Sequence, residues 1–195
     1  MTARVDPALE PGKVYRTRDL KPWTGNPTRL AKRLVRDGQL RQMAQGLFYA
    51  PQQSRFGLVP PEDTEMLRAF LGSDDFVITG PQKWNVLGLG STAVYPVTLV
   101  YNTKRSGDFH LGGRRYRLRR VRFPRAPEPE WYVVDLMEHH EMAGVSLSQV
   151  EKRLVAALSG HRFDSEKLRQ AARSFATSET QNRIERAIQR AAALT

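Results

Sequence analysis

The sequence predicts an α+β protein, and three observations favour that fold class. A short amphipathic run at residues 26–38 ends at a glycine and is followed by two short segments typical of strands. Between residues 76 and 123, β-forming segments are separated by glycine and proline breaks. After residue 125, apolar residues recur at helical spacing. We therefore expect an N-terminal helix and hairpin, a β-rich middle and a helical C-terminal part.

The run from Asn26 to Gly38 predicts an amphipathic helix. Asn26 is a favoured N-cap, Pro27 is tolerated at the first helical position, and Gly38 suits the residue just past a helix end. At about 100° per residue, apolar residues fall on one side of this helix and cations on the other. The apolar residues are Leu30, Ala31 and Leu34, and the cations are Arg29, Lys32, Arg33 and Arg36.

Residues 39–50 predict a β-hairpin with its turn at residues 44–46. A short strand is expected at residues 12–15, and a short first helix at Thr17–Trp23. Helix, glycine and hairpin follow each other in this order in a winged helix-turn-helix. We expect such a domain over residues 1–57, with Leu40, Met43, Leu47 and Tyr49 as the packing face of the hairpin.

The cationic helix face suits contact with double-stranded DNA. Arginine can bond guanine bidentately in a major groove, lysine mostly meets phosphate, and backbone N–H groups at a helix N-terminus also favour phosphate. The alternative is a solvated face, but such faces usually mix charges of both signs, and this one has no acid before Asp37. The residues expected to contact DNA are Thr28, Arg29, Lys32, Arg33 and Arg36 on the helix and Arg41, Gln42 and Gln45 on the hairpin.

Residues 51–61 are expected to be a loop and a domain boundary, because they end in a Pro60–Pro61 break. A second domain, mixed β-sheet and helix, would then span residues 58–195. Its first part predicts a helix from Pro61 to Gly72 and strands and a hairpin up to residue 123. In the last strand Tyr116 and Leu118 are out of phase with Val121 and Phe123, which suggests a β-bulge near Arg119–Arg120.

Four helices are expected after residue 125. The first carries Tyr132, Val133, Leu136, Met137 and His140 on one face. Ser148 with Glu151, and Ser178 with Gln181, have the spacing of a capping box, and Asp164 can cap another helix.

Composition and charge exclude several classes of protein. The chain contains no cysteine, so disulfides and cysteine-ligated metal sites are excluded. No apolar run approaches the roughly 20 residues of a membrane span. The N-terminus lacks the apolar core of a signal peptide, so a cytoplasmic location is expected. The net charge of +11 favours a polyanionic partner.

A second basic segment lies at residues 101–125, which hold nine Lys/Arg and a single acid. A nucleic-acid groove and a surface for an acidic protein partner are both possible, and a high arginine content can also reflect a GC-rich genome. This possible second basic surface comprises Arg114, Arg115, Arg117, Arg119, Arg120 and Arg122.

The acids and histidines at residues 135–141 resemble metal ligands only at first sight. On a helix, Asp135, Glu138 and His139 face one way and His140 another, and no H-E-x-x-H spacing occurs. An exposed polar helix face is the expected interpretation. We find no P-loop, no G-x-S-x-G and no paired-carboxylate pattern, and therefore expect no catalytic site, no metal and no cofactor.

Three segments of the chain resemble AbiEi-type antitoxins. The segment LAKRLVRDGQLRQMAQGLFYAP is similar to the N-terminal winged helix of that family, and VITGPQKWNVLGL at Val77–Leu89 is similar to the element that follows. The segment PVTLVYNTKRSGDFHLGGRRYRLRRV resembles the next strand, polar loop and hairpin. The resemblance covers roughly residues 12–125, and the helical tail is similar in kind only.

The resemblance implies the antitoxin of a type IV toxin–antitoxin pair. In that family the winged helix represses its own operon by binding inverted repeats, which allows a dimer on DNA. The C-terminal domain counters a nucleotidyltransferase-like toxin without requiring a stable complex. The DNA-contact role is thereby assigned to Arg29, Lys32, Arg33 and Arg36, and the wing role to Arg41–Gln45.

Two other functions remain open at this stage. A binding module could use the Arg114–Arg122 strand to hold an acidic protein or an RNA. A nuclease could use the helix at Asp135–Glu141.

Overall fold

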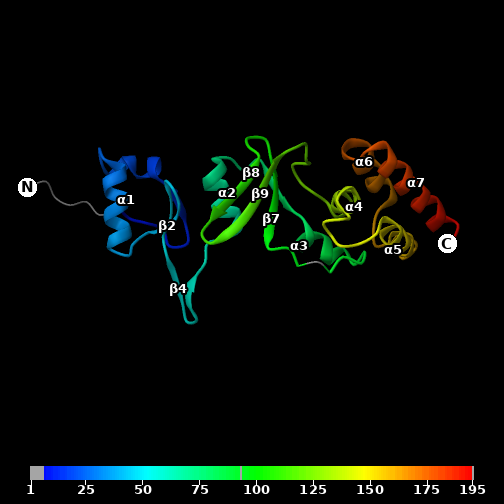
Figure 1. Cartoon of the computed structure of the whole chain (residues 1–195), viewed down its shortest axis with the longest axis horizontal. Helices are drawn as coiled ribbons and strands as arrows, with labels where there is room; N and C mark the ends of the chain where they lie inside the picture. The colour runs from blue at the N-terminus through cyan, green and yellow to red at the C-terminus, as the bar shows by residue number, and fades with distance from the viewer. Residues whose placement is uncertain (1–6, 93, 195) are drawn as a thin grey trace, which may run out of the picture. The chain divides into compact units, whose positions relative to one another are not determined.

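The computed structural model describes residues 7–92 and 94–194, and the chain forms two compact units (Figure 1). The first unit comprises the chain up to Asp74 together with His110–Arg114, and the second comprises Asp75–Phe109 and the chain from Arg115 onward. The boundary expected between residues 57 and 58 falls inside a strand of the first unit. Helices and several sheets make up the structure, so the chain has a mixed α+β fold.

The first unit begins with a three-stranded antiparallel sheet and two short helices. Strand β1 (Val14–Arg16) leads into the 3₁₀ helix η1 (Thr17–Trp23), and helix α1 (Pro27–Arg36) follows. Strands β2 (Arg41–Ala44) and β3 (Leu47–Tyr49) form the hairpin, and β3 also pairs with β1, so that the strand order is β1-β3-β2. The helices and the hairpin predicted for residues 17–50 are therefore present.

Helix α1 has the termini that its sequence predicts. The Asn26 side-chain oxygen accepts a hydrogen bond from the Arg29 N–H at 3.0 Å, and Pro27 occupies the first helical position. Gly38, just past the C-terminus, adopts a φ of +73°, which suits glycine. The buried side of α1 packs into a core with η1 and the sheet. This core contains Tyr15, Leu20, Leu30, Ala31, Leu34, Leu40, Phe48 and Ala50, with Trp23 packed against it.

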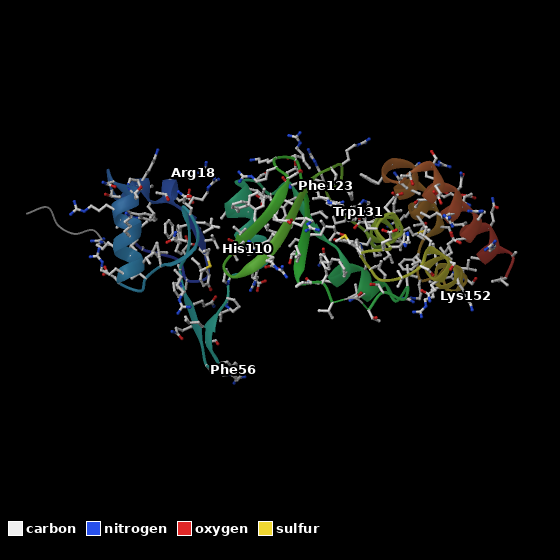
Figure 2. The ribbon with its side chains drawn as sticks, in the orientation of Figure 1. Arg18, Phe56, His110, Phe123, Trp131 and Lys152 are labelled. Atoms are coloured by element: carbon white, nitrogen blue, oxygen red, sulfur yellow. The ribbon has the colours of Figure 1, made fainter. Side chains whose placement is uncertain are left out.

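The loop predicted at residues 51–61 is a second hairpin, so that prediction was wrong. Strand β4 (Gln52–Ser54) pairs with β5 (Gly57–Val59), and the Tyr49 hydroxyl donates to the Val59 carbonyl at 2.6 Å. Phe56, at the tip, is 86% exposed (Figure 2). Sequence patterning missed this hairpin because β4 is polar and neither three-residue strand contains a buried residue, so no apolar alternation appears. Helix α2 (Asp63–Leu71) follows and ends at Gly72, as predicted.

The second unit contains a four-stranded sheet of order β6-β7-β9-β8. These strands are β6 (Phe76–Thr79), β7 (Val97–Asn102), β8 (Gly107–Leu111) and β9 (Arg114–Arg120). Between β6 and β7 lie α3 (Pro81–Trp84) and the 3₁₀ helix η2 (Asn85–Leu87). The turn of the β8–β9 hairpin, at His110–Arg114, belongs to the first unit. There the Gly112 N–H donates a hydrogen bond to the Met43 carbonyl at 2.9 Å.

No β-bulge interrupts β9 in its pairing with β7, so the predicted bulge was wrong. The parallel register runs without a shift from Val97 opposite Arg115 to Asn102 opposite Arg120. The strand ends at Arg120, and Val121 and Phe123 lie beyond it. Their change of phase therefore reflects the end of the strand.

Four helices complete the second unit: α4 (Pro129–Glu138), α5 (Leu147–Ser159), α6 (Ser165–Phe175) and α7 (Ser178–Ala192). Asp164 caps α6 as predicted. The other two predicted caps were displaced, because Ser146 with Gln149 caps α5 and Thr177 caps α7. Ser146 offers the same capping-box spacing as Ser148, and spacing alone cannot choose between them. Throughout the described residues, no helix combines the length and apolar character that crossing a bilayer requires.

We predict that Asn26→Ala destabilises α1 by about 1 kcal/mol, because the N-cap hydrogen bond to the Arg29 amide is lost. Hydrogen exchange of the α1 amides would measure this change locally. Asn26→Asp keeps a capping oxygen and is the matched control. Equal exchange in the wild-type protein and both variants would contradict a capping role for Asn26.

Candidate functional site

The candidate site in the first unit starts from the exposed face of α1. Leu30, Ala31 and Leu34 are buried, whereas Lys32 and Arg36 lie opposite them and are exposed. Thr28 and Arg29 are also exposed, but Arg33 is half-buried, because its position brings it close to the buried edge of the helix. The face that the helix offers to solvent is therefore centred on Lys32 and Arg36, with Arg33 at its margin.

Helix α1 and the β2–β3 hairpin line one groove together. Thr28 and Lys32 contribute from the helix, and Gln42 and Gln45 contribute from the hairpin. Its apolar wall is formed by Ala31, Val35 and Phe48, and its volume is about 480 Å³. The structure thus brings together four of the eight residues that the sequence predicts for DNA contact.

The hairpin turn next to this groove depends on a glycine. Gly46 adopts a φ of +71°, and a Cβ at this position would lie 3.3 Å from the Thr17 hydroxyl oxygen. Thr17 lines the same groove. A side chain at position 46 would therefore be strained by its backbone conformation and crowded by η1.

The remaining predicted DNA contacts lie outside the groove. Arg29 and Arg36 are exposed on α1, and Arg41 is exposed on β2. Within the described part of the chain, Arg29, Lys32, Arg36 and Arg41 make no ion pair or hydrogen bond through their side chains. Binding an anion would therefore not require any of these four side chains to break an interaction with the described residues.

The six arginines of the second basic segment do not share one environment. Arg114 forms an ion pair with Asp63 and donates to the Pro61 carbonyl, both within the first unit. In the second unit, Arg117 binds Asp108 through Nε at 2.8 Å and Nη2 at 3.0 Å. Arg119 and Arg122 line a pocket, whereas Arg115 and Arg120 are exposed. Two of the six are thus already neutralised by carboxylates.

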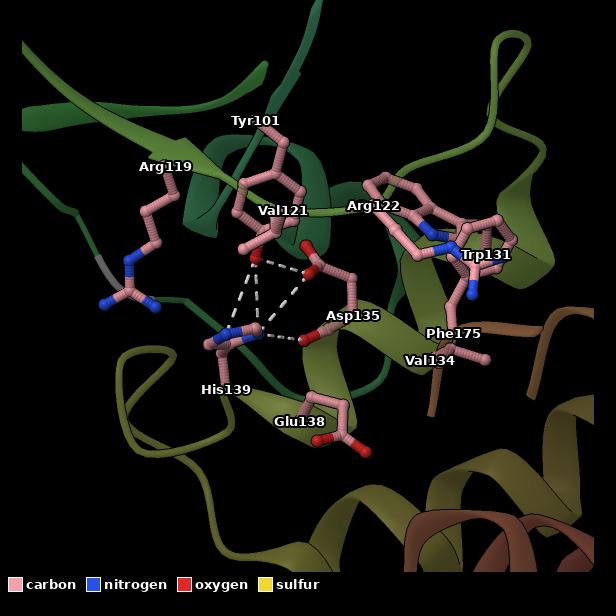
Figure 3. Close-up of a pocket in the computed structure, with 10 residues that line it drawn as sticks. All are labelled: Tyr101, Arg119, Val121, Arg122, Trp131, Val134, Asp135, Glu138, His139 and Phe175. Carbon is pink, nitrogen blue, oxygen red and sulfur yellow. Dashed lines mark hydrogen bonds and ion pairs between the residues drawn. The ribbon is translucent and has the colours of Figure 1, made fainter. Parts of the chain in front are cut away.

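The second unit also contains a buried carboxylate that the sequence did not reveal. Asp135 of α4 is 5% exposed and accepts hydrogen bonds from three other elements. Thr79 of β6 donates to Oδ2, as does the Trp84 indole N–H of α3 at 3.0 Å. The Tyr101 hydroxyl of β7 donates to Oδ1 at 2.7 Å (Figure 3). Since a buried carboxylate must be hydrogen-bonded, this group ties the four elements to one geometry.

His139 lies one helical turn after Asp135 and forms an ion pair with it when protonated. Its Nδ1 is 3.3 Å from Asp135 Oδ1 and 3.0 Å from the Asp135 carbonyl oxygen, and its ring stacks on Trp84. The hydrogen bond to the Asp135 side chain is the main cause that raises the pKa of His139, and it outweighs the opposing effect of burial. Burial, followed by the neighbouring Asp135 charge, raises the pKa of the Tyr101 hydroxyl, so this group remains a donor.

The expectation of an exposed polar face at residues 135–141 was wrong for Asp135. Glu138, His139 and His140 are half-buried, and Glu141 is exposed. One signal in the sequence was available: Asp135 interrupts an otherwise apolar run from Trp131 to Met137. A lone acid in such a run indicates a buried carboxylate that needs donors from elsewhere in the fold. Among the described residues, no group of three acids, histidines or cysteines could hold a metal ion.

Comparison with known proteins identifies a solved structure of similar fold. No family model matches the chain, and no curated protein matches it. The chain is similar to the crystal structure of the RV2827C protein from Mycobacterium tuberculosis, with a TM-score of 0.52 and 15% sequence identity. The match covers 92% of this chain and 72% of that one. The shared feature is the fold.

We predict that the second unit loses stability as the pH rises from about 6.5 through the raised folded-state pKa of His139. Because the folded-state pKa of His139 is raised above the unfolded value of about 6.5, its stabilising contribution is complete below that value and disappears as the pH passes through the folded pKa. The groups that face His139 are Asp135, Tyr101 and Arg119. Thermal unfolding of wild type and His139→Gln across this range would measure the effect. An identical pH dependence in the two proteins would contradict it.

Proposed function

We propose that the first unit is a winged helix-turn-helix and that the protein is the DNA-binding antitoxin of a type IV toxin–antitoxin system. The observation that carries the DNA-binding part is the groove shared by α1 and the β2–β3 hairpin. Thr28 and Lys32 on the helix, and Gln42 and Gln45 on the hairpin, line it side by side. In this proposal η1 is the first helix of the motif, α1 the recognition helix and β2–β3 the wing.

The chemistry of α1 supports duplex DNA as the partner. Its exposed cations can neutralise phosphates, and its exposed Arg and Gln neighbours can bond base edges. Asn26 and Pro27 leave the helix N-terminus at the surface, where backbone N–H groups favour a phosphate. The fixed cap and the packed apolar face hold these groups in one orientation.

The antitoxin part of the proposal rests on the resemblance to AbiEi-type antitoxins. By that resemblance the protein represses its own operon at inverted repeats, which suits a dimer on DNA, and acts in the cytoplasm. The second unit then counters a nucleotidyltransferase-like toxin, and no stable complex with the toxin is required. Such a role is that of a regulator and not of an enzyme.

The rival proposal, a binding module built on the Arg114–Arg122 strand, has less support. Arg114 and Arg117 are engaged by Asp63 and Asp108, so recruiting them would require breaking those ion pairs. Arg29, Lys32 and Arg36 of α1 have no such cost, because they form no ion pair with a carboxylate among the described residues.

We predict that Lys32→Ala with Arg36→Ala weakens binding to DNA from the protein's own promoter at least tenfold. Two phosphate contacts fewer should also reduce the slope of log affinity against log salt by about two units. Fluorescence anisotropy at several salt concentrations would measure both quantities. Arg29→Ala with Arg33→Ala should weaken binding less, because Arg33 is half-buried.

The matched control is Lys152→Ala with Arg190→Ala, which removes the same charge from exposed positions on α5 and α7 (Lys152 in Figure 2). This variant should keep wild-type affinity. If it weakens binding as much as the α1 variant, the attraction is a property of net charge, and the proposed recognition helix is wrong.

A further inference from the structure

A pocket in the second unit has a chemistry that the DNA-binding proposal does not use. It lies among β9, α4 and α6, and has a volume of about 190 Å³ (Figure 3). Asp135, Tyr101 and His139 form its inner wall. The oxygens of Asp135 are occupied by Thr79, Trp84 and Tyr101. This carboxylate therefore shapes the pocket and is not offered to a ligand.

Two arginines line this pocket without a carboxylate partner among the described residues. Neither the Arg119 nor the Arg122 side chain forms a hydrogen bond or ion pair with any described residue. In Figure 3, Arg119 lies on the side of His139, and Arg122 on the side of Trp131 and Phe175. One end of the pocket thus presents a guanidinium next to an imidazole, a pair of donors suited to an oxyanion.

The other end of the pocket suits a flat ring. Trp131 and Phe175 meet edge to face with centroids 6.4 Å apart, and Val121 and Val134 extend this apolar wall. Arg122 adds a planar guanidinium on that side. Aromatic side chains and guanidinium planes are the groups on which nucleobases stack.

A single acceptor is also available at the rim. Glu138 Oε1 accepts from the Thr177 N–H and hydroxyl, both at 2.8 Å. Its second oxygen, Oε2, has no hydrogen bond with the described residues. That oxygen can accept from an amino or hydroxyl group of a ligand.

We propose that this pocket binds one nucleoside monophosphate unit. The phosphate meets Arg119 and His139, the base lies between Arg122 and the Trp131–Phe175 wall, and Glu138 Oε2 accepts from the sugar or the base. The volume is below the roughly 300 Å³ of sites that enclose drug-sized ligands. The pocket is therefore too small to enclose a dinucleotide cofactor. This site is independent of the proposed role of the first unit.

The proposal is tested by calorimetric titration of the full chain with AMP, CMP, GMP and UMP, and with adenosine, ribose 5-phosphate and inorganic phosphate. We expect at least one nucleotide to bind at least tenfold tighter than adenosine and ribose 5-phosphate, because only the nucleotide engages both ends of the pocket. Ribose 5-phosphate or inorganic phosphate binding as tightly as every nucleotide would overturn it, as would no binding of any nucleotide at millimolar concentration.

Substitutions test whether the nucleotide binds in this pocket. Arg119→Ala should weaken the affinity for the tightest-binding nucleotide about tenfold, because a charge-assisted hydrogen bond is lost. Arg122→Ala should weaken this affinity by a smaller factor. The control is Arg120→Ala, an exposed arginine on the same strand that does not line the pocket. Wild-type affinity in Arg120→Ala with weakened binding in Arg119→Ala supports the pocket. An equal loss of affinity in both variants would show that binding depends on net charge, and it would overturn the assignment of the nucleotide to this pocket. All three substitutions should leave the melting temperature nearly unchanged, because these side chains form no hydrogen bond or ion pair with the described residues.

Discussion

The arrangement of β6, α3, β7 and α4 depends on the buried Asp135 carboxylate. The Asp135 carboxylate is 5% exposed, and leaving such a buried charge without partners costs several kcal/mol. Its donors come from β6, α3 and β7, while Asp135 itself belongs to α4. A shift of any one of these elements would remove a donor from a charged acceptor. The carboxylate therefore fixes how the sheet, the short helix α3 and the first of the C-terminal helices meet.

The consequence for function is a hydrogen-bonded wall beside arginines that have no ionic partner among the described residues. Tyr101 and His139 are held by Asp135, whereas Arg119 and Arg122 have no hydrogen-bonded or ionic partner among the described residues. Pre-organised walls with uncommitted cations favour binding, because little internal interaction is lost when an anion arrives. The first unit has the same division: the core under α1 is packed and capped, and Lys32 and Arg36 outside it are uncommitted.

Local signals predicted the elements that begin with a cap or end at a glycine. Helix α1 followed from Asn26, Pro27 and Gly38, and α6 followed from Asp164. Where two serines offered the same spacing, as Ser146 and Ser148 do, the sequence could not choose between them. The β4–β5 hairpin left no pattern, because its two three-residue strands contain no buried residue. The end of β9 resembled a bulge, because a strand end and a bulge both change the phase of apolar residues.

The helical periodicity predicted which side of α1 faces solvent. It locates the boundary between the exposed and buried sides only to within about one residue. It grouped Arg33 with Lys32 and Arg36, although Arg33 lies at the half-buried margin. The groove could not be foreseen, because it depends on how the hairpin packs against α1. The Asp135 cluster was out of reach for a similar reason. Thr79, Trp84 and Tyr101 are 34 to 56 residues away in the chain, and only the fold brings their donors to one carboxylate.

Hydrogen exchange of the full chain with and without DNA from its own promoter tests the central claim most directly. The account predicts slower exchange at residues 26–46, where α1 and the hairpin line the groove, and unchanged exchange in α4 and in the part of β9 within the second unit. Slower exchange confined to residues 115–122, with α1 unaffected, would contradict it.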